Sequence, residues 1–217
     1  ALVDMYAKCG MFRRAQKVMD EIVIRDVVSW NALISGYVES GLSEEALQYL
    51  HKIHECGVSP DEATFVCVLK ACSTLESTEE GRRIHAKVVV IGMERSIVLC
   101  NTLLDLYTKC GLLQEAKEAF ELLPEPDVVT WTALIAGYAQ LKDDYVFQML
   151  DQMENKGNKP DSTTFVSVLC ACNHGGSVEK AERCLISMIK GYDITPNVEH
   201  YTCMIESLGR AGQINKA

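Results

Sequence analysis

Apolar residues recur along the chain at helical spacing, in pairs of short segments that turn residues separate. In the segment beginning at residue 27, Leu33, Ile34 and Tyr37 fall on one face of a helix. A later segment shows the same one-sided spacing, i, i+3, i+4 and i+7, at Ala116, Ala119, Phe120 and Leu123. Nothing in the pattern requires a β-strand. The pattern therefore predicts an all-α protein built from pairs of short amphipathic helices.

Internal repeats give these helical pairs a fixed order. VVSWNALISGY at 27–37 returns as VVTWTALIAGY at 128–138, ATFVCVLKAC at 63–72 as TTFVSVLCAC at 163–172, and ALVDMYAKCG at 1–10 as TLLDLYTKCG at 102–111. The long period of 101 residues divides into units of 35, 35 and 31 residues. The predicted units are 1–26 (the remainder of a 31-residue unit), 27–61, 62–96, 97–127, 128–161, 162–197 and 198–217 (incomplete).

Turn residues mark the helix ends within these units. Gly41, Gly111 and Gly212 fall between the two helices of a unit, and all five prolines lie in the last four residues of a unit, where proline interrupts no helix. Ser77 with Glu80 is a capping-box pattern expected to open a second helix. Two short helices cannot cover their own apolar face, so neighbouring units must stack into an α-solenoid. A tetratricopeptide array of similar period is the alternative.

The repeated motifs resemble pentatricopeptide repeats. VVSWNALISGY with VSPD, and VVTWTALIAGY with NKPD, are similar to the P type, ATFVCVLKAC and TTFVSVLCAC to the L type, and TLLDLYTKCG to the short S type. The triplet order covers the whole chain and resembles the PLS class of plant organellar RNA-binding proteins, of the RNA-editing-factor type. The resemblance implies a right-handed α-solenoid that binds single-stranded RNA sequence-selectively and specifies a site of C-to-U editing.

In this family the fifth and the last residue of each unit read one RNA base. Carried onto this chain, the base-reading pairs are Asn31 with Asp61, Asn101 with Asp127, and Thr132 with Asp161, while Asp26 and Thr202 are base-reading residues of incomplete units. An ionised Asp favours uracil and guanine, whose Watson–Crick edges carry a ring N–H donor. The resemblance implies that Asn with Asp reads U and that Thr with Asp reads G.

Alternatives remain open for several of these positions. Val28, Val98 and Val129, the second residues of their units, resemble the base-stacking residues of the family, but they could instead pack at the helix start. The polar fifth residues could bond nearby backbone, although this would not account for the paired aspartates. In the L-type units Val66 and Val166 occupy the fifth position, where they cannot hydrogen-bond a base, so these units are expected to discriminate poorly.

Composition limits the other classes of function. Of 217 residues, 48% are hydrophobic and 24% are charged, as in a folded protein. The net charge of −9 repels phosphate, so only modest RNA affinity is expected. No catalytic signature occurs, including the HxE and PCxxC of zinc deaminases, so no enzyme activity, cofactor or metal is expected within this stretch.

The ten cysteines include no CxxC motif. Cys9 with Cys110, and Cys72 with Cys172, occupy equivalent places in the repeats. This pattern favours small buried packing residues in a reducing compartment over metal ligands.

The ends of the sequence and its apolar runs bear on location. No apolar run approaches the roughly 18 residues of a membrane span, and no membrane association is expected. The sequence begins at Ala1 inside a helical pattern, so it is expected to be a piece of a longer protein whose targeting peptide lies upstream. The resemblance implies a mitochondrial or chloroplast location, small organellar editing-cofactor proteins that dock on the L-type units, and in some members a following deaminase domain. A tetratricopeptide-like protein-interaction scaffold is the alternative function.

Overall fold

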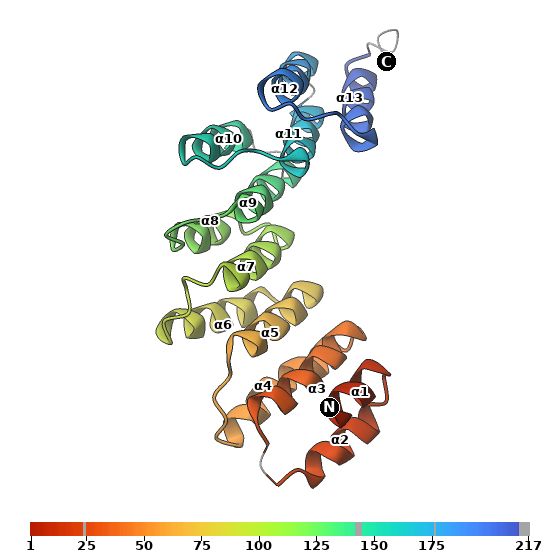
Figure 1. Cartoon of the computed structure of the whole chain (residues 1–217), viewed down its shortest axis with the longest axis vertical. Helices are drawn as coiled ribbons and strands as arrows, with labels where there is room; N and C mark the ends of the chain where they lie inside the picture. The colour runs from red at the N-terminus through yellow and green to blue at the C-terminus, as the bar shows by residue number, and fades with distance from the viewer. Residues whose placement is uncertain (24, 142–144, 176, 213–217) are drawn as a thin grey trace. The chain divides into compact units, whose positions relative to one another are not determined.

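The computed structural model describes residues 1–23, 25–141, 145–175 and 177–212, and this part of the chain contains thirteen α-helices and no β-strand (Figure 1). The all-α prediction is confirmed. The helices are α1 (Leu2–Lys8), α2 (Phe12–Glu21), α3 (Val27–Glu39), α4 (Ser43–Glu55), α5 (Glu62–Leu75), α6 (Thr78–Val90), α7 (Ile97–Lys109), α8 (Leu113–Glu121), α9 (Val128–Gln140), α10 (Tyr145–Asn155), α11 (Ser162–Gly175), α12 (Val178–Gly191) and α13 (Val198–Arg210).

The starts of six helices follow the repeat pattern. Helices α3, α5, α7, α9, α11 and α13 begin at Val27, Glu62, Ile97, Val128, Ser162 and Val198, the first residues of the predicted units. Asp, Ser or Asn precedes each of them. These residue types favour a helix start because a short side chain with an oxygen acceptor can bond the free N–H groups of the first turn.

Residues 1–110 form one compact unit. Within it α1, α3, α5 and α7 pack side by side as one layer, and α2, α4 and α6 pack against that layer as a second one (Figure 1). Leu33, Ile34 and Tyr37 are buried, as the apolar spacing predicts. Aromatic packing joins three of the helices, because Tyr37 of α3 stacks on Phe12 of α2 and on Tyr49 of α4, with ring centroids 4.2 and 5.2 Å apart.

Helices α1 and α3 approach each other closely at Gly36. A Cβ atom at Gly36 would lie 2.5 Å from the Cβ of Ala7 and 3.1 Å from the Ala7 carbonyl carbon, which is closer than van der Waals contact allows. Glycine is therefore required at this position for the two helices to pack as they do.

Residues 111–217 form the second compact unit. Helices α9, α11 and α13 pack side by side, and α8, α10 and α12 pack against them. The predicted apolar stripe of α8 is buried at Ala116, Ala119 and Phe120, and Leu123 just after the helix is buried with them. Each compact unit is thus a stack of helical pairs, the repeat fold that the sequence predicts.

Turn residues mostly lie where the sequence places them. Gly41, Gly111 and Gly212 have φ angles of 76°, 72° and 68°, in the left-handed region that glycine adopts without strain. All five prolines lie outside the helices. The capping box expected at Ser77 with Glu80 is wrong: Ser77 precedes α6, but its side chain makes no capping hydrogen bond. Its ψ of 83° is far from the more extended backbone of the residues that do cap.

The cysteines only partly follow their interpretation as buried packing residues. Cys72 and Cys172 are buried, but Cys9 is exposed and Cys110 only partly buried, so the prediction is wrong for that pair. Both residues follow the last residue of a helix and stand just before a left-handed glycine, at the end of the helix rather than on its packed face. The sulfurs of Cys170 in α11 and Cys203 in α13 lie 3.2 Å apart, and a hydrogen bond from Cys203 lowers the pKa of the Cys170 thiol.

Candidate nucleic-acid interface

The last residue of each predicted unit caps the first helix of the next. The carboxylates of Asp26 and Asp127 accept the backbone N–H of Ser29 and Thr130, each at 2.8 Å. The same type of cap is made by Asp61, Ser96, Asp161 and Asn197. An N-cap satisfies one of the N–H groups that a helix start leaves free, and a carboxylate also suits the positive end of the helix dipole. The fold itself therefore fixes the position of the predicted base-reading aspartates.

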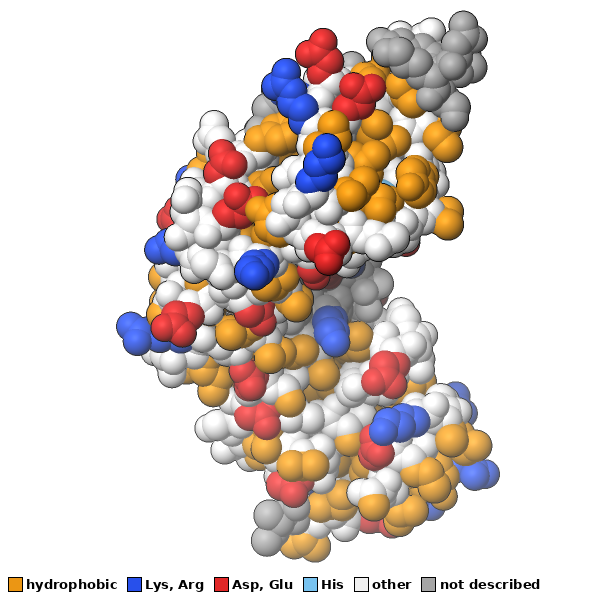
Figure 2. Space-filling model, turned by 45° about the horizontal axis from the view of Figure 1, so that its top comes forward, with side chains coloured by type: hydrophobic (Ala, Val, Ile, Leu, Met, Phe, Trp, Pro, Cys, Tyr) orange, Lys and Arg blue, Asp and Glu red, His pale blue; other side chains and the backbone are white. Residues whose placement is uncertain are grey.

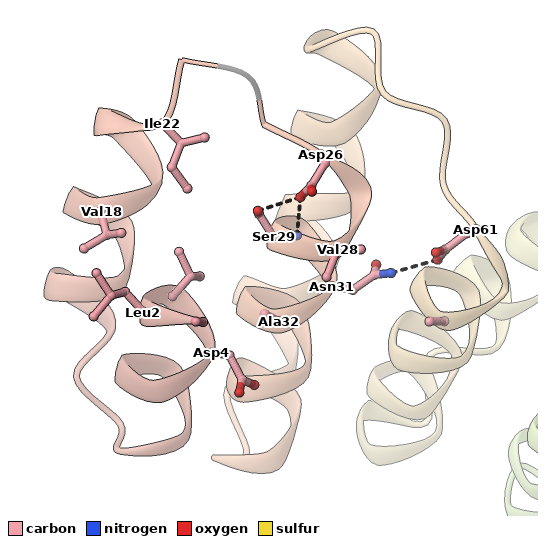
Figure 3. A pocket seen from close by; sticks show the side chains of 13 residues that line it. Leu2, Asp4, Val18, Ile22, Asp26, Val28, Ser29, Asn31, Ala32 and Asp61 are labelled. Atoms are coloured by element: carbon pink, nitrogen blue, oxygen red, sulfur yellow. Dashed lines mark hydrogen bonds between the residues drawn. The ribbon is translucent and has the colours of Figure 1, made fainter.

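Asn31 in α3 is bonded to the start of α5. Its Nδ2 donates to Oδ1 of Asp61 at 2.8 Å, and its Oδ1 accepts the Thr64 hydroxyl at 2.6 Å. Thr64 also donates to Oδ1 of Asp61 through its backbone N–H at 2.9 Å, and its hydroxyl lies 2.9 Å from the same oxygen. Figure 3 shows Asn31 and Asp61 facing each other between the two helices. The fifth and last residues of unit 27–61 thus lie side by side.

Thr132 in α9 stands in the equivalent place in the second compact unit. Its hydroxyl lies 2.7 Å from the hydroxyl of Thr164, which in turn donates to Oδ1 of Asp161 at 2.8 Å. The Thr164 backbone N–H donates to the same carboxylate oxygen at 2.8 Å. Thr132 therefore reaches Asp161 through Thr164, whereas Asn31 contacts Asp61 directly.

A cavity of about 850 Å³ opens beside the first of these pairs. Its lining includes Asp26, Val28, Asn31 and Asp61 together with residues of α1 and α2 such as Leu2 and Val18 (Figure 3). Asn31 and Asp61 lie together at one edge of the cavity, Asp26 and Asp4 lie at other points of its lining, and apolar side chains form much of the remainder. This combination suits a flat ring with a polar edge, because the ring face can contact apolar groups while its edge forms hydrogen bonds.

Three valines at the helix starts are exposed. Val28, Val98 and Val129 have 68%, 53% and 62% of their surface in solvent. A packing residue would be covered by neighbouring side chains, so this exposure argues against the packing alternative and leaves the valines available to a ligand. In units 62–96 and 162–197, Val66 and Val166 are half-buried and offer no polar group.

The other predicted base-reading residues, called readers below, belong to incomplete units or to a pair divided between the two compact units. Asn101 is in α7 of unit 1–110 and Asp127 caps α9 in unit 111–217, so their pairing stays a prediction. Asp26 is exposed and bonds Ser29. Thr202 donates its hydroxyl to the Val198 carbonyl at 2.8 Å. This bond to nearby backbone is the local use that had been the alternative for polar fifth residues.

Hydrogen bonds favour the charged form of two capping aspartates. The hydroxyl and the backbone N–H of Ser29 lower the pKa of Asp26. At Asp61 partial burial alone would raise the pKa, but hydrogen bonds from Thr64 and Asn31 outweigh burial and lower it. An ionised carboxylate only accepts hydrogen bonds. Within the described part of the chain the bonds of Asp61 all involve Oδ1, which leaves Oδ2 as an acceptor for a ligand N–H.

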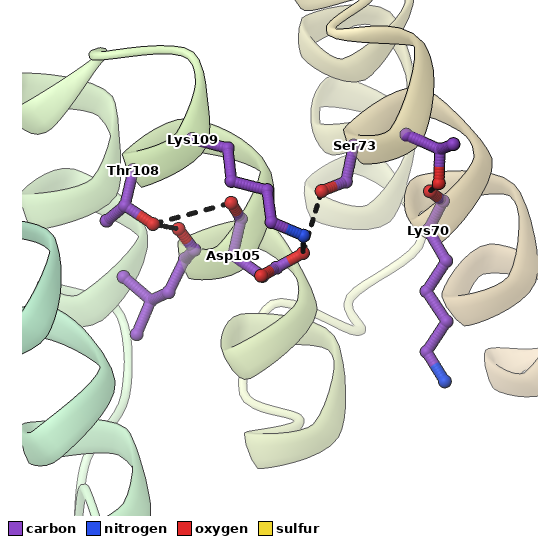
Figure 4. A network of polar contacts seen from close by, with 7 residues as sticks. Lys70, Ser73, Asp105, Thr108 and Lys109 are labelled. Carbon is purple, nitrogen blue, oxygen red and sulfur yellow. Dashed lines mark hydrogen bonds and ion pairs between the residues drawn. The ribbon is translucent and has the colours of Figure 1, made fainter.

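Two lysines in the layer formed by the first helices of the units are paired with acids. Lys8 and Lys109, at equivalent places in the repeats, lie 3.2 and 2.9 Å from Asp4 and Asp105. Asp105 also accepts the hydroxyl of Ser73 from the neighbouring α5 at 2.7 Å, as Figure 4 shows. The positive charge of each of these two lysines is thus already balanced by a neighbouring aspartate.

Charges of both signs are scattered over the surface. On the face drawn in Figure 2, Lys and Arg side chains alternate with Asp and Glu among hydrophobic side chains. Among the residues that the structure describes, no three His, Cys, Asp or Glu side chains are grouped so that they could hold a metal ion. None of the described helices is both long and apolar enough to cross a membrane.

Sequence reasoning missed two residues at this interface, Thr64 and Thr164. Both are buried and both bond the reader pair of the preceding unit. A signal was present, because each stands three residues after a capping Asp, in the segments DEAT and DSTT, and Asp-x-x-Thr is a capping-box pattern.

Family models cover most of the chain. A model described as PPR repeat family matches residues 25–74 and 126–174, and one described as PPR repeat matches residues 1–27, 98–125, 163–191 and 199–217. A pentatricopeptide repeat-containing protein of Arabidopsis thaliana is 37% identical over 217 residues, which are all of this chain and 43% of the relative. A second, named as mitochondrial, is 38% identical over all of this chain and 32% of the relative. The chain thus spans less than half of these relatives.

Solved structures show the same fold. The crystal structure of the pentatricopeptide repeat protein PPR10 from maize matches 99% of this chain and 32% of its own, with a TM-score of 0.74 and 26% identity. The structure of PPR10 in complex with an 18-nt psaJ RNA element matches 99% of this chain and 32% of its own, with a TM-score of 0.83 and 21% identity.

Proposed function

The chain belongs to the pentatricopeptide repeat family, and on this premise we propose that it binds single-stranded RNA through its first-helix layers, with one repeat reading one base. The observation that carries the proposal is the polar bridge that recurs in both compact units. Asn31 with Asp61, and Thr132 with Asp161, are each joined across neighbouring first helices by a threonine. The readers are thus held in a fixed geometry, as a base-reading site requires, with Asn31 half-buried and Thr132 8% exposed.

The chemistry of the pairs supports U and G as their bases. Oδ2 of Asp61 and of Asp161 makes no hydrogen bond within the described residues, so each can accept the ring N–H of uracil or guanine. Adenine and cytosine present an acceptor there and are repelled. The exposed valines Val28 and Val129, three residues before the readers, provide apolar contacts for the faces of the bases.

The proposal extends to the partners and location of the longer protein. We propose that the repeats specify a C-to-U editing site in a mitochondrial or chloroplast transcript, and that the deamination itself is performed elsewhere than in this stretch. The L-type second helices would dock small editing-cofactor proteins. Exposed apolar side chains on α6, directly after it and on α12 support this docking, namely Val89, Val90, Ile91, Ile186 and Ile189.

A binding experiment with short RNAs tests the base-reading proposal. An RNA carrying U, any base, U and G in 5′ to 3′ order, aligned to the units that begin at 27, 62, 97 and 128, should bind more tightly than its scrambled version. One poorly matched base edge costs roughly 1–3 kcal/mol, so several mismatches should weaken binding by at least about tenfold. Fluorescence anisotropy with labelled RNA measures the ratio.

The position of the unspecified base provides an internal control. Changing the nucleotide aligned to unit 62–96 should alter affinity little, because Val66 offers no hydrogen bond. Equal affinity for the designed and scrambled RNAs would contradict base reading and favour the alternative, a protein-interaction scaffold.

A further inference from the structure

Both L-type units carry a buried threonine at their third position that touches the readers of the preceding unit. The side chains of Thr64 and Thr164 are fully buried, with 0% exposure. A hydroxyl group has one hydrogen to donate and two lone pairs that accept. Because each of these hydroxyls contacts two reader side chains, the direction of its single hydrogen decides what the reader can still offer to a base.

At Thr164 the direction is fixed by charge. Its hydroxyl lies 2.8 Å from Oδ1 of Asp161, a carboxylate that can only accept, so the Thr164 hydrogen points there. The Thr132 hydroxyl, 2.7 Å away, must then donate its own hydrogen to the Thr164 oxygen. The Thr132 oxygen is left with lone pairs alone and can only accept from a ligand.

At Thr64 the hydrogen bonds leave the neighbouring reader, Asn31, as a donor rather than an acceptor. The Thr64 hydroxyl lies 2.6 Å from Oδ1 of Asn31 and 2.9 Å from Oδ1 of Asp61, and its hydrogen points to the nearer oxygen because Oδ1 of Asp61 already accepts two N–H groups. The amide of Asn31 is thus oriented by its two partners, with Nδ2 facing the carboxylate at 2.8 Å and Oδ1 facing the Thr64 hydroxyl. Turning the amide over would place its oxygen against the carboxylate. Nδ2 uses one hydrogen on Asp61 and keeps the second, so Asn31 remains a donor.

We infer that Thr64 and Thr164 are specificity-determining positioning residues, which act through the readers of the preceding unit by fixing Asn31 as a hydrogen-bond donor and Thr132 as an acceptor. This inference rests on the proposed function. A donor beside Asp61 matches uracil, which offers a carbonyl next to its ring N–H. An acceptor beside Asp161 matches guanine, whose ring N–H is flanked by an amino group. The base read by each of these units is thus set by three residues from two units.

The variant Thr164→Val tests this inference because valine keeps the shape and removes the hydroxyl. The Thr132 hydroxyl is then free to turn and donate to a uracil carbonyl. At the nucleotide aligned to unit 128–161, the ratio of affinities for G-containing over U-containing RNA should fall by about two- to tenfold, the usual effect of one hydrogen bond. The U-over-G ratio at the nucleotide aligned to unit 27–61 should stay unchanged in the same protein.

Two further variants separate positioning from a purely structural role. Thr164→Ser keeps the hydroxyl and should keep the wild-type ratio. Thr130→Val removes an equally buried hydroxyl that bonds a capping carboxylate, Asp127, at 2.7 Å, but does not touch the Thr132 reader. It should leave the ratio at unit 128–161 unchanged, even if it weakens binding to every RNA alike.

The outcomes distinguish this inference from the proposed function. A wild-type chain with no preference between G and U at this nucleotide would overturn base reading itself. A wild-type preference that persists in Thr164→Val, with the variant folded by circular dichroism, would overturn the role of Thr164. So would an equal loss of the ratio in Thr164→Ser or in Thr130→Val.

Discussion

At the scale of single residues, two similar polar sites differ in one side chain. Asn31 bonds Asp61 and Thr64 directly, whereas Thr132 bonds Thr164 and reaches Asp161 through it. The aspartate and the threonine are thus common to both sites, and only the fifth residue of the unit changes. A change of base preference between the two units must therefore come from this residue.

Replacing Thr132 with Asn recreates the first site within the second. The variant Thr132→Asn should shift the preferred nucleotide at unit 128–161 from G towards U, because the amide offers a donor where the hydroxyl offered an acceptor. By analogy with base discrimination in DNA, the change is worth roughly 1–3 kcal/mol, or about a five- to hundredfold change in the G-over-U ratio. Competition binding with RNAs that differ only at this nucleotide measures the shift.

The control for this substitution is Val66→Ala in unit 62–96, which should change base preference little. An unaltered G-over-U ratio in a folded Thr132→Asn protein would show that the fifth position does not read the base.

Whether the role of a residue could be predicted from the sequence depends on how far along the chain its contacts reach. The pairing of Asn31 with Asp61 was expected from the family resemblance, which assigns base reading to the fifth and last residues of a unit, and the structure places the two side chains in contact. The roles of Thr64 and Thr164 could not be predicted, since they depend on hydrogen bonds to residues 32 or 33 positions earlier, in another unit. Similarly, Cys9 and Cys110 were predicted to be buried from their recurrence alone, which does not reveal which way a helix end faces.

At the scale of helices, repeat spacing and capping residues together determine where each first helix begins. Spacing alone gives a start within a residue or two, and the Asp, Ser or Asn before it fixes the first N–H bonds. This is why these starts were predictable. The start of α6 shows the limit: Ser77 and Glu80 have suitable side chains, but Ser77 follows α5 by a short turn with a ψ of 83° and makes no capping hydrogen bond.

The close contact between α1 and α3 leads to a prediction about stability. The variant Gly36→Ala should lower the free energy of unfolding by roughly 1–3 kcal/mol, because its new methyl group would lie 2.5 Å from the Cβ of Ala7 and force the helices apart. Chemical denaturation followed by circular dichroism measures the difference.

A matched control is available in α13. A Cβ atom at Gly209 would meet no heavy atom within 4 Å. Gly209→Ala should therefore be neutral or stabilise the protein by up to about 1 kcal/mol through helix propensity. Equal stability of Gly36→Ala and the wild type would contradict the close packing of α1 on α3.

At the scale of the whole molecule, charge sets how the chain can bind a polyanion. The net charge is −9, and Lys8 and Lys109 already have aspartate partners. Binding that depended on phosphates would have to overcome general repulsion and break these ion pairs. Base edges and base faces must then supply most of the affinity, which agrees with the polar readers and exposed valines at the helix starts.

This balance predicts a weak dependence of RNA binding on salt. Each phosphate neutralised on a single strand contributes about −0.7 to the slope of log K against log salt concentration, so roughly three contacts give a slope of about −2. Titrating the designed RNA over a range of salt concentrations measures the slope. The variant Asp105→Asn frees Lys109 from its counter-charge, so it should increase affinity and make the slope steeper by up to about 0.7. A wild-type slope steeper than about −5 would mean that phosphate contacts dominate, and base contacts would then no longer account for the binding.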